Sequence, residues 1–309
     1  MNAREKAFPL PEGNNLAPKR LTANPELNTP ATSQYVSNTD DENEENIDTP
    51  KNDVFFRGSE CIHDNIAFVP TVLAETALEM TGNTHSDSDI GVLYGSAGAG
   101  KSRILREYAR RNDAAILIEA CPGYTARVLL QVLCEKLDVR KITGTVHELS
   151  ERCIMALRGT RRVVLIDEAE LLPHRALEVM RRIHDRSSCG LLLAGMPRLL
   201  LNLRGAGGVY EQLYSRVGMA LDLDDAKLMS EECDFHAILS GLIQAEMPGY
   251  VMTSEIIHAF RAESGGNYRR AFKLVRGVIR ASKKPGSKGV SVQLIKKYGS
   301  MLINKCGKM

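Results

Sequence analysis

Eight consecutive residues have the types and spacing to hold a phosphate chain. The segment Gly95-Ser96-Ala97-Gly98-Ala99-Gly100-Lys101-Ser102 follows an apolar run, Ile90–Tyr94, and leads into a helix-prone stretch, Arg103–Arg111. Glycines let backbone N–H groups curl round an anion without Cβ clashes, and the new helix directs its positive dipole end at the same point. This order of strand, loop and helix is that of a P-loop and predicts a nucleotide site.

The last two residues of that loop have separate expected tasks. Lys101 is expected to reach the β- and γ-phosphates of ATP, and the hydroxyl of Ser102 is expected to hold Mg²⁺. The alternative is a chance glycine-rich turn. The motif fixes four positions, occupied here by Gly95, Gly100, Lys101 and Ser102. This combination recurs by accident in only roughly one per cent of chains of this length, and the strand before it and the helix after it lower that share further.

Two neighbouring carboxylates supply the second part of the predicted site. They end the short aliphatic run Arg162–Glu168, which is typical of a strand buried on both faces. Asp167 is expected on the Mg²⁺ side of the nucleotide, and Glu168 is expected to orient and deprotonate the attacking water. The alternative is that both acids belong to a solvated helix start.

Length and composition indicate a globular protein with one large core and a smaller appended domain. The chain has 309 residues, of which 43% are hydrophobic and 25% charged. No apolar stretch approaches the ~20 residues of a membrane span, and residues 1–10 lack a hydrophobic signal core, so we expect a cytoplasmic protein without a membrane partner. Seven scattered cysteines without a C-x-x-C pair predict reduced thiols, and the histidine spacing predicts no transition-metal site.

Charge is segregated along the chain. Residues 1–56 carry five Lys/Arg against ten Asp/Glu, whereas residues 57–309 carry 35 against 28, and residues 264–309 contain twelve Lys/Arg and no acid. The basic end suggests a nucleic-acid partner, with a solvated lysine tail as the alternative. Residues 1–53 are polar and acidic and predict a disordered tail. A passive linker is the favoured role for this tail, and docking a partner or mimicking DNA are the alternatives.

The remaining pattern divides into an α/β part, residues 54–226, and a helical part, residues 227–309. In the first part we expect strands at Ile90–Tyr94, Ala114–Ala120, Arg162–Asp167, Gly190–Gly195 and Gly218–Leu223, and helices at Ile66–Met80, Arg103–Arg111, Thr125–Leu137, His147–Leu157 and Pro173–Arg186, with a polar loop at Gly82–Asp89. Alternation of this kind predicts a five-stranded parallel sheet covered by helices on both faces. The second part predicts a helical lid domain with helices at Ser230–Glu246, Thr253–Ser264, Asn267–Lys284 and Ser291–Asn304.

With these pieces in this order, the chain resembles the AAA+ ATPases, and among them the transposition regulators typified by the phage Mu B protein, TnsC and TniB. The resemblance covers about residues 55–304. Besides the P-loop and the acid pair, it rests on Ile166–Leu172, Ala176–Arg181, Gly190–Gly195 and Leu213–Val217. The P-loop and the acid pair are specific for a P-loop ATPase, and the later segments are the ones similar to Mu B.

The resemblance implies further roles for three positions. Arg216 matches an arginine finger that reaches the γ-phosphate bound by a neighbouring subunit, and packing on its own helix is the alternative. Arg269, at the start of the sensor-2 helix, is expected to couple the lid to the nucleotide, with Arg270 as the alternative residue. Where the family usually has a polar sensor after the fourth strand, this chain has Met196, so we expect slow hydrolysis or a substitute side chain.

The function implied is that of an ATP-dependent regulator of transposition. Such proteins oligomerise on double-stranded DNA as a filament or ring, activate a DDE-type transposase, and disassemble when ATP is hydrolysed, an activity stimulated by DNA or the partner. The expected DNA contacts are Arg140, Lys141, Arg127 and Arg158, with ordinary surface charge as the alternative reading of all four. Mu B begins with a helix-turn-helix domain. The first fifty-odd residues of this chain lack the apolar periodicity from which such a domain could be built.

Two other functional classes share the same core motifs. A helicase loader or replication initiator would grip single-stranded DNA or a replicative helicase. A secretion-associated or signalling ATPase would have no nucleic-acid partner at all.

Overall fold

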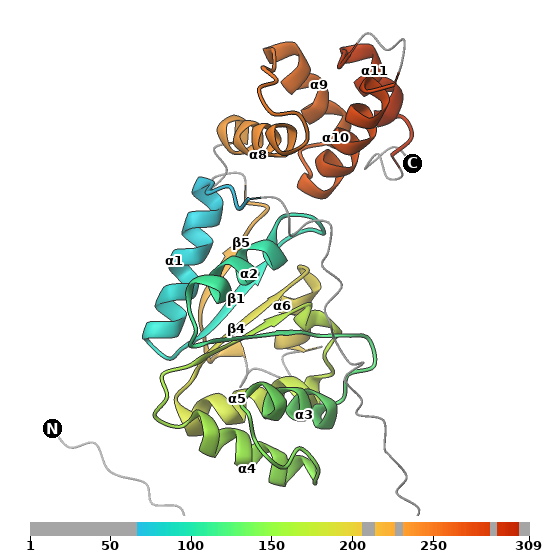
Figure 1. The fold of residues 1–309 in the computed structure, drawn as a ribbon. Coiled ribbons are helices and arrows are strands. Elements are labelled where there is room, and N and C mark those ends of the chain that lie inside the picture. The colour runs from blue at the N-terminus through green and yellow to red at the C-terminus, as the bar shows by residue number, and fades with distance from the viewer. Residues whose placement is uncertain (1–66, 206–213, 226–230, 285–288, 303–309) are drawn as a thin grey trace, which may run out of the picture. The chain divides into compact units, whose positions relative to one another are not determined.

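Five parallel strands form one sheet in the computed structural model, which describes residues 67–205, 214–225, 231–284 and 289–302 (Figure 1). The strands are β1 (Ile90–Tyr94), β2 (Ala115–Glu119), β3 (Val163–Asp167), β4 (Gly190–Gly195) and β5 (Val217–Asp222). Their order across the sheet is β2-β3-β4-β1-β5, and every neighbouring pair is parallel. All five carboxyl ends therefore lie at one edge, and the predicted α/β fold is confirmed.

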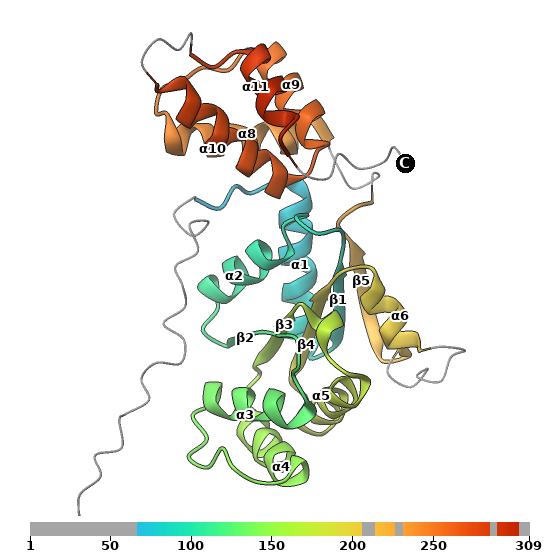
Figure 2. The same cartoon turned by 90° about the vertical axis from the view of Figure 1, so that its right-hand side faces the viewer.

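Helices cover both faces of the sheet, as Figures 1 and 2 show. One face carries α1 (Val72–Ser86) and α2 (Lys101–Arg111). The other carries α3 (Ala126–Lys136), α4 (Val146–Leu157), α5 (His174–Ser187) and the short α6 (Arg198–Arg204). Because helices lie on both sides, β3 and β4 are buried along their whole length, which explains their uninterrupted apolar sequences.

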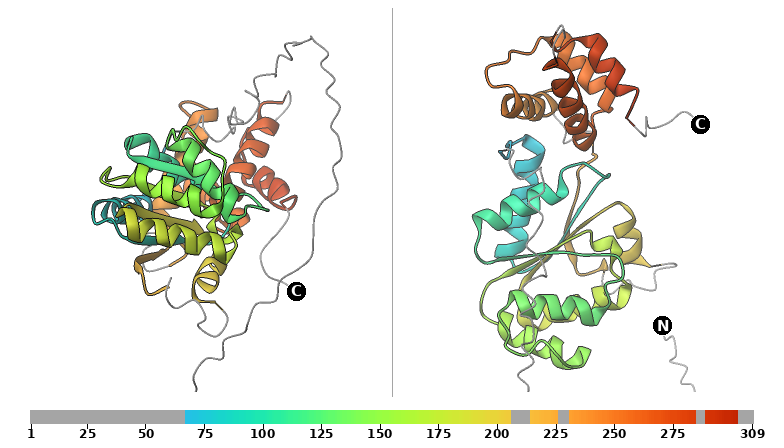
Figure 3. Two further views of the ribbon diagram at one scale, coloured as in Figure 1. Left: turned by 90° about the horizontal axis from the view of Figure 1, so that it is seen from below. Right: turned by 45° about the vertical axis from the view of Figure 1, so that its right-hand side comes forward.

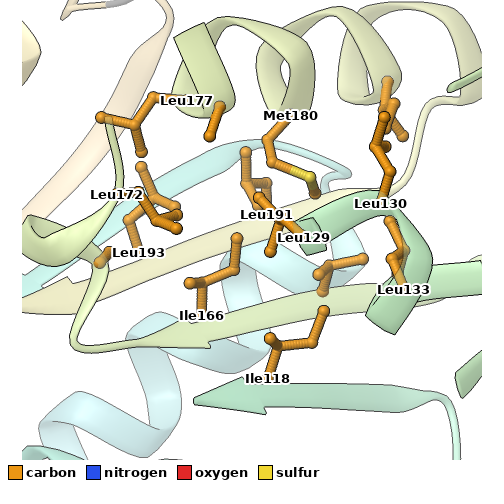
Figure 4. Packing of buried hydrophobic residues seen from close by; sticks show 14 of the residues in the cluster. Ile118, Leu129, Leu130, Leu133, Ile166, Leu172, Leu177, Met180, Leu191 and Leu193 are labelled. Atoms are coloured by element: carbon orange, nitrogen blue, oxygen red, sulfur yellow. The ribbon is translucent and has the colours of Figure 1, made fainter. Parts of the chain in front are cut away.

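The larger apolar core lies between the sheet and the helices α3, α4 and α5. Figure 4 shows the side chains that meet there: Ile118, Ile166, Leu191 and Leu193 from the strands, and Leu129, Leu130, Leu133, Leu177 and Met180 from the helices. Complete burial of one such side chain is worth about 1.5–3 kcal/mol. This layer holds the central strands, and with them the residues at their carboxyl ends, in a fixed register.

The C-terminal region is helical, as predicted. It consists of α8 (Glu231–Glu246), α9 (Ser254–Ser264), α10 (Tyr268–Ser282) and α11 (Val292–Gly299), drawn in orange to red in Figure 3. These helices share an apolar cluster of their own, which includes Phe260. The predicted acidic tail, residues 1–53, and the predicted division between residues 226 and 227 lie outside the described residues. The domain boundaries therefore stay predictions.

The first helix differs from its predicted form at both ends. It begins at Val72, where Thr71 accepts a hydrogen bond from the Ala74 N–H at 3.1 Å, and Pro70 disfavours a helical residue before it. It then continues through Gly82–Ser86, so the predicted loop there was wrong. The polar stretch stays helical because its buried Thr84 packs against Gly91 of β1 at a distance that leaves no room for a Cβ.

Two short elements were not predicted. A 3₁₀ turn, η1 (Ala169–Leu171), follows the acid pair, and α6 follows β4. Both are shorter than the window over which apolar periodicity can be recognised. Among the helices of the described segments, none has the length and apolar character required to cross a bilayer.

Candidate nucleotide site

The predicted phosphate loop and the predicted acids meet at the same edge of the sheet. The loop begins at Gly95, directly after β1, and Asp167 is the last residue of β3. Strand β4 lies between these two strands, and the Gly95 N–H donates a hydrogen bond of 3.3 Å to the carbonyl of Gly195 at its end. Sheet topology thus brings together two motifs that are far apart in the sequence.

The loop has the backbone geometry of an anion cradle. Gly98 and Gly100 have φ angles of 90° and 105°, in the left-handed region that favours glycine. The turn between them contains Ala99, whose N–H donates to the Ser96 carbonyl at 3.3 Å. Helix α2 starts at Lys101, and the first N–H groups of a helix have no acceptor within it. These donors and the positive helix end favour a negatively charged ligand.

The side chain of Lys101 is folded back onto the loop. It is 8% exposed, and its Nζ donates to the carbonyls of Gly95 at 2.7 Å and Ser96 at 2.8 Å. Burial lowers the pKa of Lys101, while nearby carboxylates, Glu170 foremost and then Asp167, oppose that shift. The loop therefore encloses an ammonium group that is balanced by acids from the other side of β4.

Ser102 and Asp167 form a pair of oxygen ligands. The Ser102 hydroxyl donates a hydrogen bond to the Asp167 carboxylate, and the Glu168 N–H donates to the same carboxylate at 3.0 Å. Burial raises the pKa of Asp167, although these hydrogen bonds act in the opposite direction. A hydroxyl beside a carboxylate suits Mg²⁺, which takes hard oxygen ligands, so the residues present fit this ion.

Glu168 is held in an unusual backbone conformation. Its φ of 53° lies in the left-handed region, which costs a residue other than glycine about 1 kcal/mol. Burial raises the pKa of Glu168, and the neighbouring carboxylates of Glu170 and Asp167 raise it further. The side chain is therefore a stronger base than an exposed glutamate, which suits a group that accepts a proton from water.

Two side chains that the sequence did not single out hold the loop from outside. Asp224, just beyond β5, accepts hydrogen bonds from the Ser96 N–H and, at 2.9 Å, from the Ser96 hydroxyl. Asn267 caps α10 by accepting from the Arg270 N–H at 3.1 Å, and its Nδ2 donates to the Ala97 carbonyl at 2.7 Å. Asp224 was detectable as an acid following a strand of this sheet, but nothing local signals the contact of Asn267.

The structure distinguishes Arg269 from Arg270, the two candidates at the start of α10 for the arginine that couples the lid to the nucleotide. A Cβ placed on Gly98 would lie 2.9 Å from the Cβ of Arg269, so Arg269 begins directly against the loop, and its side chain is exposed. The Nε of Arg270 is instead buried without a hydrogen-bond partner among the described residues. Arg269 is thus the nearer of the two to the nucleotide site.

Arg216 lies at the opposite edge of the sheet from its own phosphate loop. It precedes Val217, which pairs with Ile90 at the start of β1, whereas the loop begins after the end of that strand, about 17 Å away at ~3.3 Å per residue. An arginine side chain cannot span this distance. The guanidinium is 58% exposed and lies 3.9 Å from Asp185 of α5, a contact on its own subunit.

The four predicted DNA contacts do not form one group. Arg140 and Lys141 are exposed in the loop between α3 and α4, where the Arg152 guanidinium donates to the carbonyls of Lys141 at 3.3 Å and Thr143 at 2.8 Å. Arg127 lies in the first turn of α3 and Arg158 follows α4, at the helix ends opposite to this loop. Because these helices have 11 and 12 residues, Arg127 and Arg158 lie about 16 Å from the loop that carries Arg140 and Lys141.

This combination of fold and site defines an AAA-type P-loop protein. Residues 84–203, from the end of α1 to α6, match the family described as AAA domain. Among sequence relatives, the Mu-like prophage FluMu DNA transposition protein B of Haemophilus influenzae is 26% identical over 168 residues. The ATP-dependent target DNA activator B of Escherichia phage Mu is 32% identical over 142 residues.

These matches confirm the resemblance to the Mu-type B proteins of the AAA+ class over the aligned segments. The two alignments cover 52% and 45% of this chain, and 58% and 45% of the relatives. The chain therefore spans about half the length of the relatives it matches.

Solved structures of low sequence identity share the fold. The ORC2 protein of Aeropyrum pernix has a TM-score of 0.57 at 16% identity, over 74% of this chain and 66% of that protein. The RuvB Holliday junction branch migration motor of Thermotoga maritima has a TM-score of 0.52 at 14% identity, over 76% and 70%. At these identities the likeness concerns the fold alone.

The contact between Asn267 and the loop leads to a testable prediction. Asn267→Asp keeps a side-chain acceptor for the cap of α10 but cannot donate to the Ala97 carbonyl. Because one hydrogen bond of roughly 1 kcal/mol is lost, we expect backbone amides of the loop to exchange with deuterium several-fold faster, with α10 unchanged. Hydrogen exchange with mass spectrometry measures both segments.

A matched control removes a similar donor elsewhere. Asn112→Asp deletes the Nδ2 donor to the Tyr108 carbonyl at the far end of α2 and should leave exchange in the loop unaltered. Equal exchange in the loop of Asn267→Asp and the unmodified protein would contradict the proposed link.

Proposed function

We propose that this chain is an ATP-dependent regulator of DNA transposition. In this proposal it binds ATP with Mg²⁺, assembles as a homo-oligomeric filament or ring on duplex DNA, and activates a DDE-type transposase. Hydrolysis, slow and stimulated by DNA or the partner, then releases the assembly. The observation that carries the proposal is the convergence of the phosphate loop and the Asp167-Glu168 pair at one sheet edge, in a chain related to DNA transposition protein B and target DNA activator B.

The nucleotide role follows from the charges at that edge. The loop Gly95–Ser102 supplies backbone donors and the Lys101 ammonium to the phosphates, and Ser102 and Asp167 hold Mg²⁺. When bound, Mg²⁺ neutralises charge on the phosphate oxygens. Glu168 accepts the proton of the attacking water, and Arg269 reports the position of the lid to the nucleotide. Burial of Lys101 and the raised pKa of Glu168 support these roles.

The assembly role rests on the position of Arg216. Since its guanidinium is too far from its own loop, a role at a γ-phosphate requires the loop of a neighbouring subunit. The planar guanidinium suits the spread charge of the transferred phosphoryl group. A γ-phosphate shared in this way would favour the assembled state only, and hydrolysis would remove that preference.

The DNA role rests on two exposed charges in the loop between α3 and α4. Arg140 and Lys141 occupy a loop that Arg152 holds by two hydrogen bonds, so the loop presents both charges in a fixed place. If these charges are repeated along an oligomer, many weak contacts with DNA phosphates add up to strong binding that is largely independent of the DNA sequence. Arg127 and Arg158 would extend the same footprint on the other side of the helix pair.

Assembly tests the central part of the proposal. We expect the unmodified protein with duplex DNA and a non-hydrolysable ATP analogue to form filaments or rings in the electron microscope, and Arg216→Ala to form none. Nucleotide affinity of the isolated Arg216→Ala subunit should stay within about twofold, because its own loop is intact. Arg182→Ala, which removes another exposed arginine of this region, is the control.

A mixing experiment distinguishes a shared site from a self-contained one. Lys101→Ala should not bind ATP but retains Arg216, so adding it to Arg216→Ala should restore part of the ATPase activity. Unchanged assembly by Arg216→Ala, or no restored activity in the mixture, would show that the site is complete within one subunit. Stronger competition by single-stranded than by double-stranded DNA would favour a helicase loader instead.

The assignment of Glu168 predicts a separation of binding from hydrolysis. Glu168→Gln should bind ATP as tightly as the unmodified protein and hydrolyse it at least 10²-fold more slowly, because the general base is lost. Steady-state phosphate release and nucleotide titration measure the two properties. Glu135→Gln, at an exposed position of α3, is the matched control. Hydrolysis at the unmodified rate would rule out Glu168 as the base.

The DNA loop is tested by charge reversal. Arg140→Glu combined with Lys141→Glu should weaken duplex binding and reduce the slope of log K against log salt by about 2, since each phosphate contact contributes ~0.9. Fluorescence anisotropy across a salt series measures both quantities. The pair Arg127→Glu and Arg158→Glu shows whether the footprint extends beyond the loop. Unchanged affinity in the first double variant would remove this loop from the interface.

A further inference from the structure

A buried carboxylate next to the phosphate loop has no role in the scheme above. Glu170, in the turn η1, has a side chain with 0% exposure, and neither of its oxygens has a hydrogen-bond partner among the described residues. Leaving a buried carboxylate unpaired costs several kcal/mol, so natural proteins rarely keep one without a reason. Its position therefore calls for a ligand or a mobile partner.

The surroundings of Glu170 place it within the nucleotide site. It is the nearby carboxylate with the largest effect on the pKa of Lys101, and it also raises the pKa of Glu168. One of its oxygens fills the space that a side chain at Gly195, the last residue of β4, would occupy. The carboxylate thus reaches the end of β4, where the family resemblance leads us to expect a polar side chain and the chain has Met196 instead.

Arg198 of α6 lies within ion-pair distance of this carboxylate. Its guanidinium lies 3.9 Å from Glu170, too far for a hydrogen bond, and is 56% exposed. It is attracted to Glu170 without being bonded to it, and it stands two residues beyond Met196. Charged side chains from η1 and α6 therefore meet beside the end of β4.

The backbone beneath Arg198 is well anchored. In α6, Leu199 and Leu203 are fully buried, and the Asn202 side chain donates to the carbonyl of Glu170 at 3.2 Å. Small rotations of the Arg198 side chain can therefore occur without movement of the helix. The pair of Glu170 and Arg198 therefore has a buried carboxylate at one end and an exposed guanidinium at the other.

From these contacts we propose that Arg198, oriented by its attraction to Glu170, contacts the terminal phosphate of the nucleoside triphosphate bound in its own subunit. Arg198 would thereby distinguish ATP from ADP. This inference rests on the proposed nucleotide site. A guanidinium has donors on several sides and can bridge a carboxylate and a phosphate oxygen at the same time. Arg198 thereby takes the place of the polar group that Met196 cannot supply.

The test compares two nucleotides in one protein. Arg198→Ala should leave the Kd for ADP within about twofold and weaken binding of a non-hydrolysable ATP analogue about tenfold, as expected for the loss of one charged hydrogen bond. Glu170→Gln should reduce the preference for the ATP analogue over ADP in the same direction, because Arg198 loses its anchor. Titration calorimetry with Mg²⁺ measures all four constants.

Controls separate recognition from damage to the fold. Arg198→Lys should recover part of the preference, and Arg280→Ala, an exposed arginine of α10, should retain it fully. An unchanged ratio of the two constants in Arg198→Ala, or an equal loss for both nucleotides, would overturn the inference. If the unmodified protein binds neither nucleotide, the proposed function itself fails, and that outcome is read before any variant is compared.

Discussion

The buried ammonium of Lys101 is the interaction on which the whole site depends. A lysine charge removed from water is unfavourable unless hydrogen bonds and opposite charges compensate it. The carbonyls of Gly95 and Ser96 provide the hydrogen bonds, so the loop is curled around the lysine. The opposite charges come from the end of β3 and from η1, across β4. Loop shape and sheet order are thus two parts of one charge balance.

Strand β4 makes this balance possible by ending in a residue without a side chain. Gly195 leaves the space that the carboxylate of Glu170 fills, between the phosphate loop on one side and Glu168 on the other. Three carboxylates then crowd one sheet edge, and burial together with this crowding raises the pKa of Glu168 and increases its basicity. A divalent cation and nearby arginines are the charges that can offset this crowding.

The phosphate loop is also tied to the chain segments that lead to the helical region. Asp224 bonds Ser96 from the end of β5, and Asn267 bonds Ala97 from the start of α10. These two contacts lie on consecutive residues of the loop. A shift of α10 relative to the sheet would therefore be transmitted through the Asn267 side chain directly to the backbone of the phosphate loop.

Much of the fold could be predicted from the sequence because the signals are local. The limits of β1 and β4 were predicted to the residue, since buried parallel strands are uninterrupted apolar runs, and the helices α3 and α4 differ by only one or two residues from their periodicity. The P-loop was equally clear, because its spacing is contained in eight residues. Asp167 and Glu168 could be placed at a strand end for the same reason.

Tertiary structure alone decided the rest, because those features depend on contacts between distant segments. Packing against Gly91 keeps the polar end of α1 helical, and the parallel register of β5 with β1 places Arg216 out of reach of its own loop. The roles of Asp224 and Asn267 arise only when β5 and α10 meet the loop. Glu170 is one more acid in the sequence, and its burial beside Lys101 exists only once β3, β4 and β1 are assembled. Local patterns determine elements, whereas desolvation and charge pairing depend on which elements become neighbours.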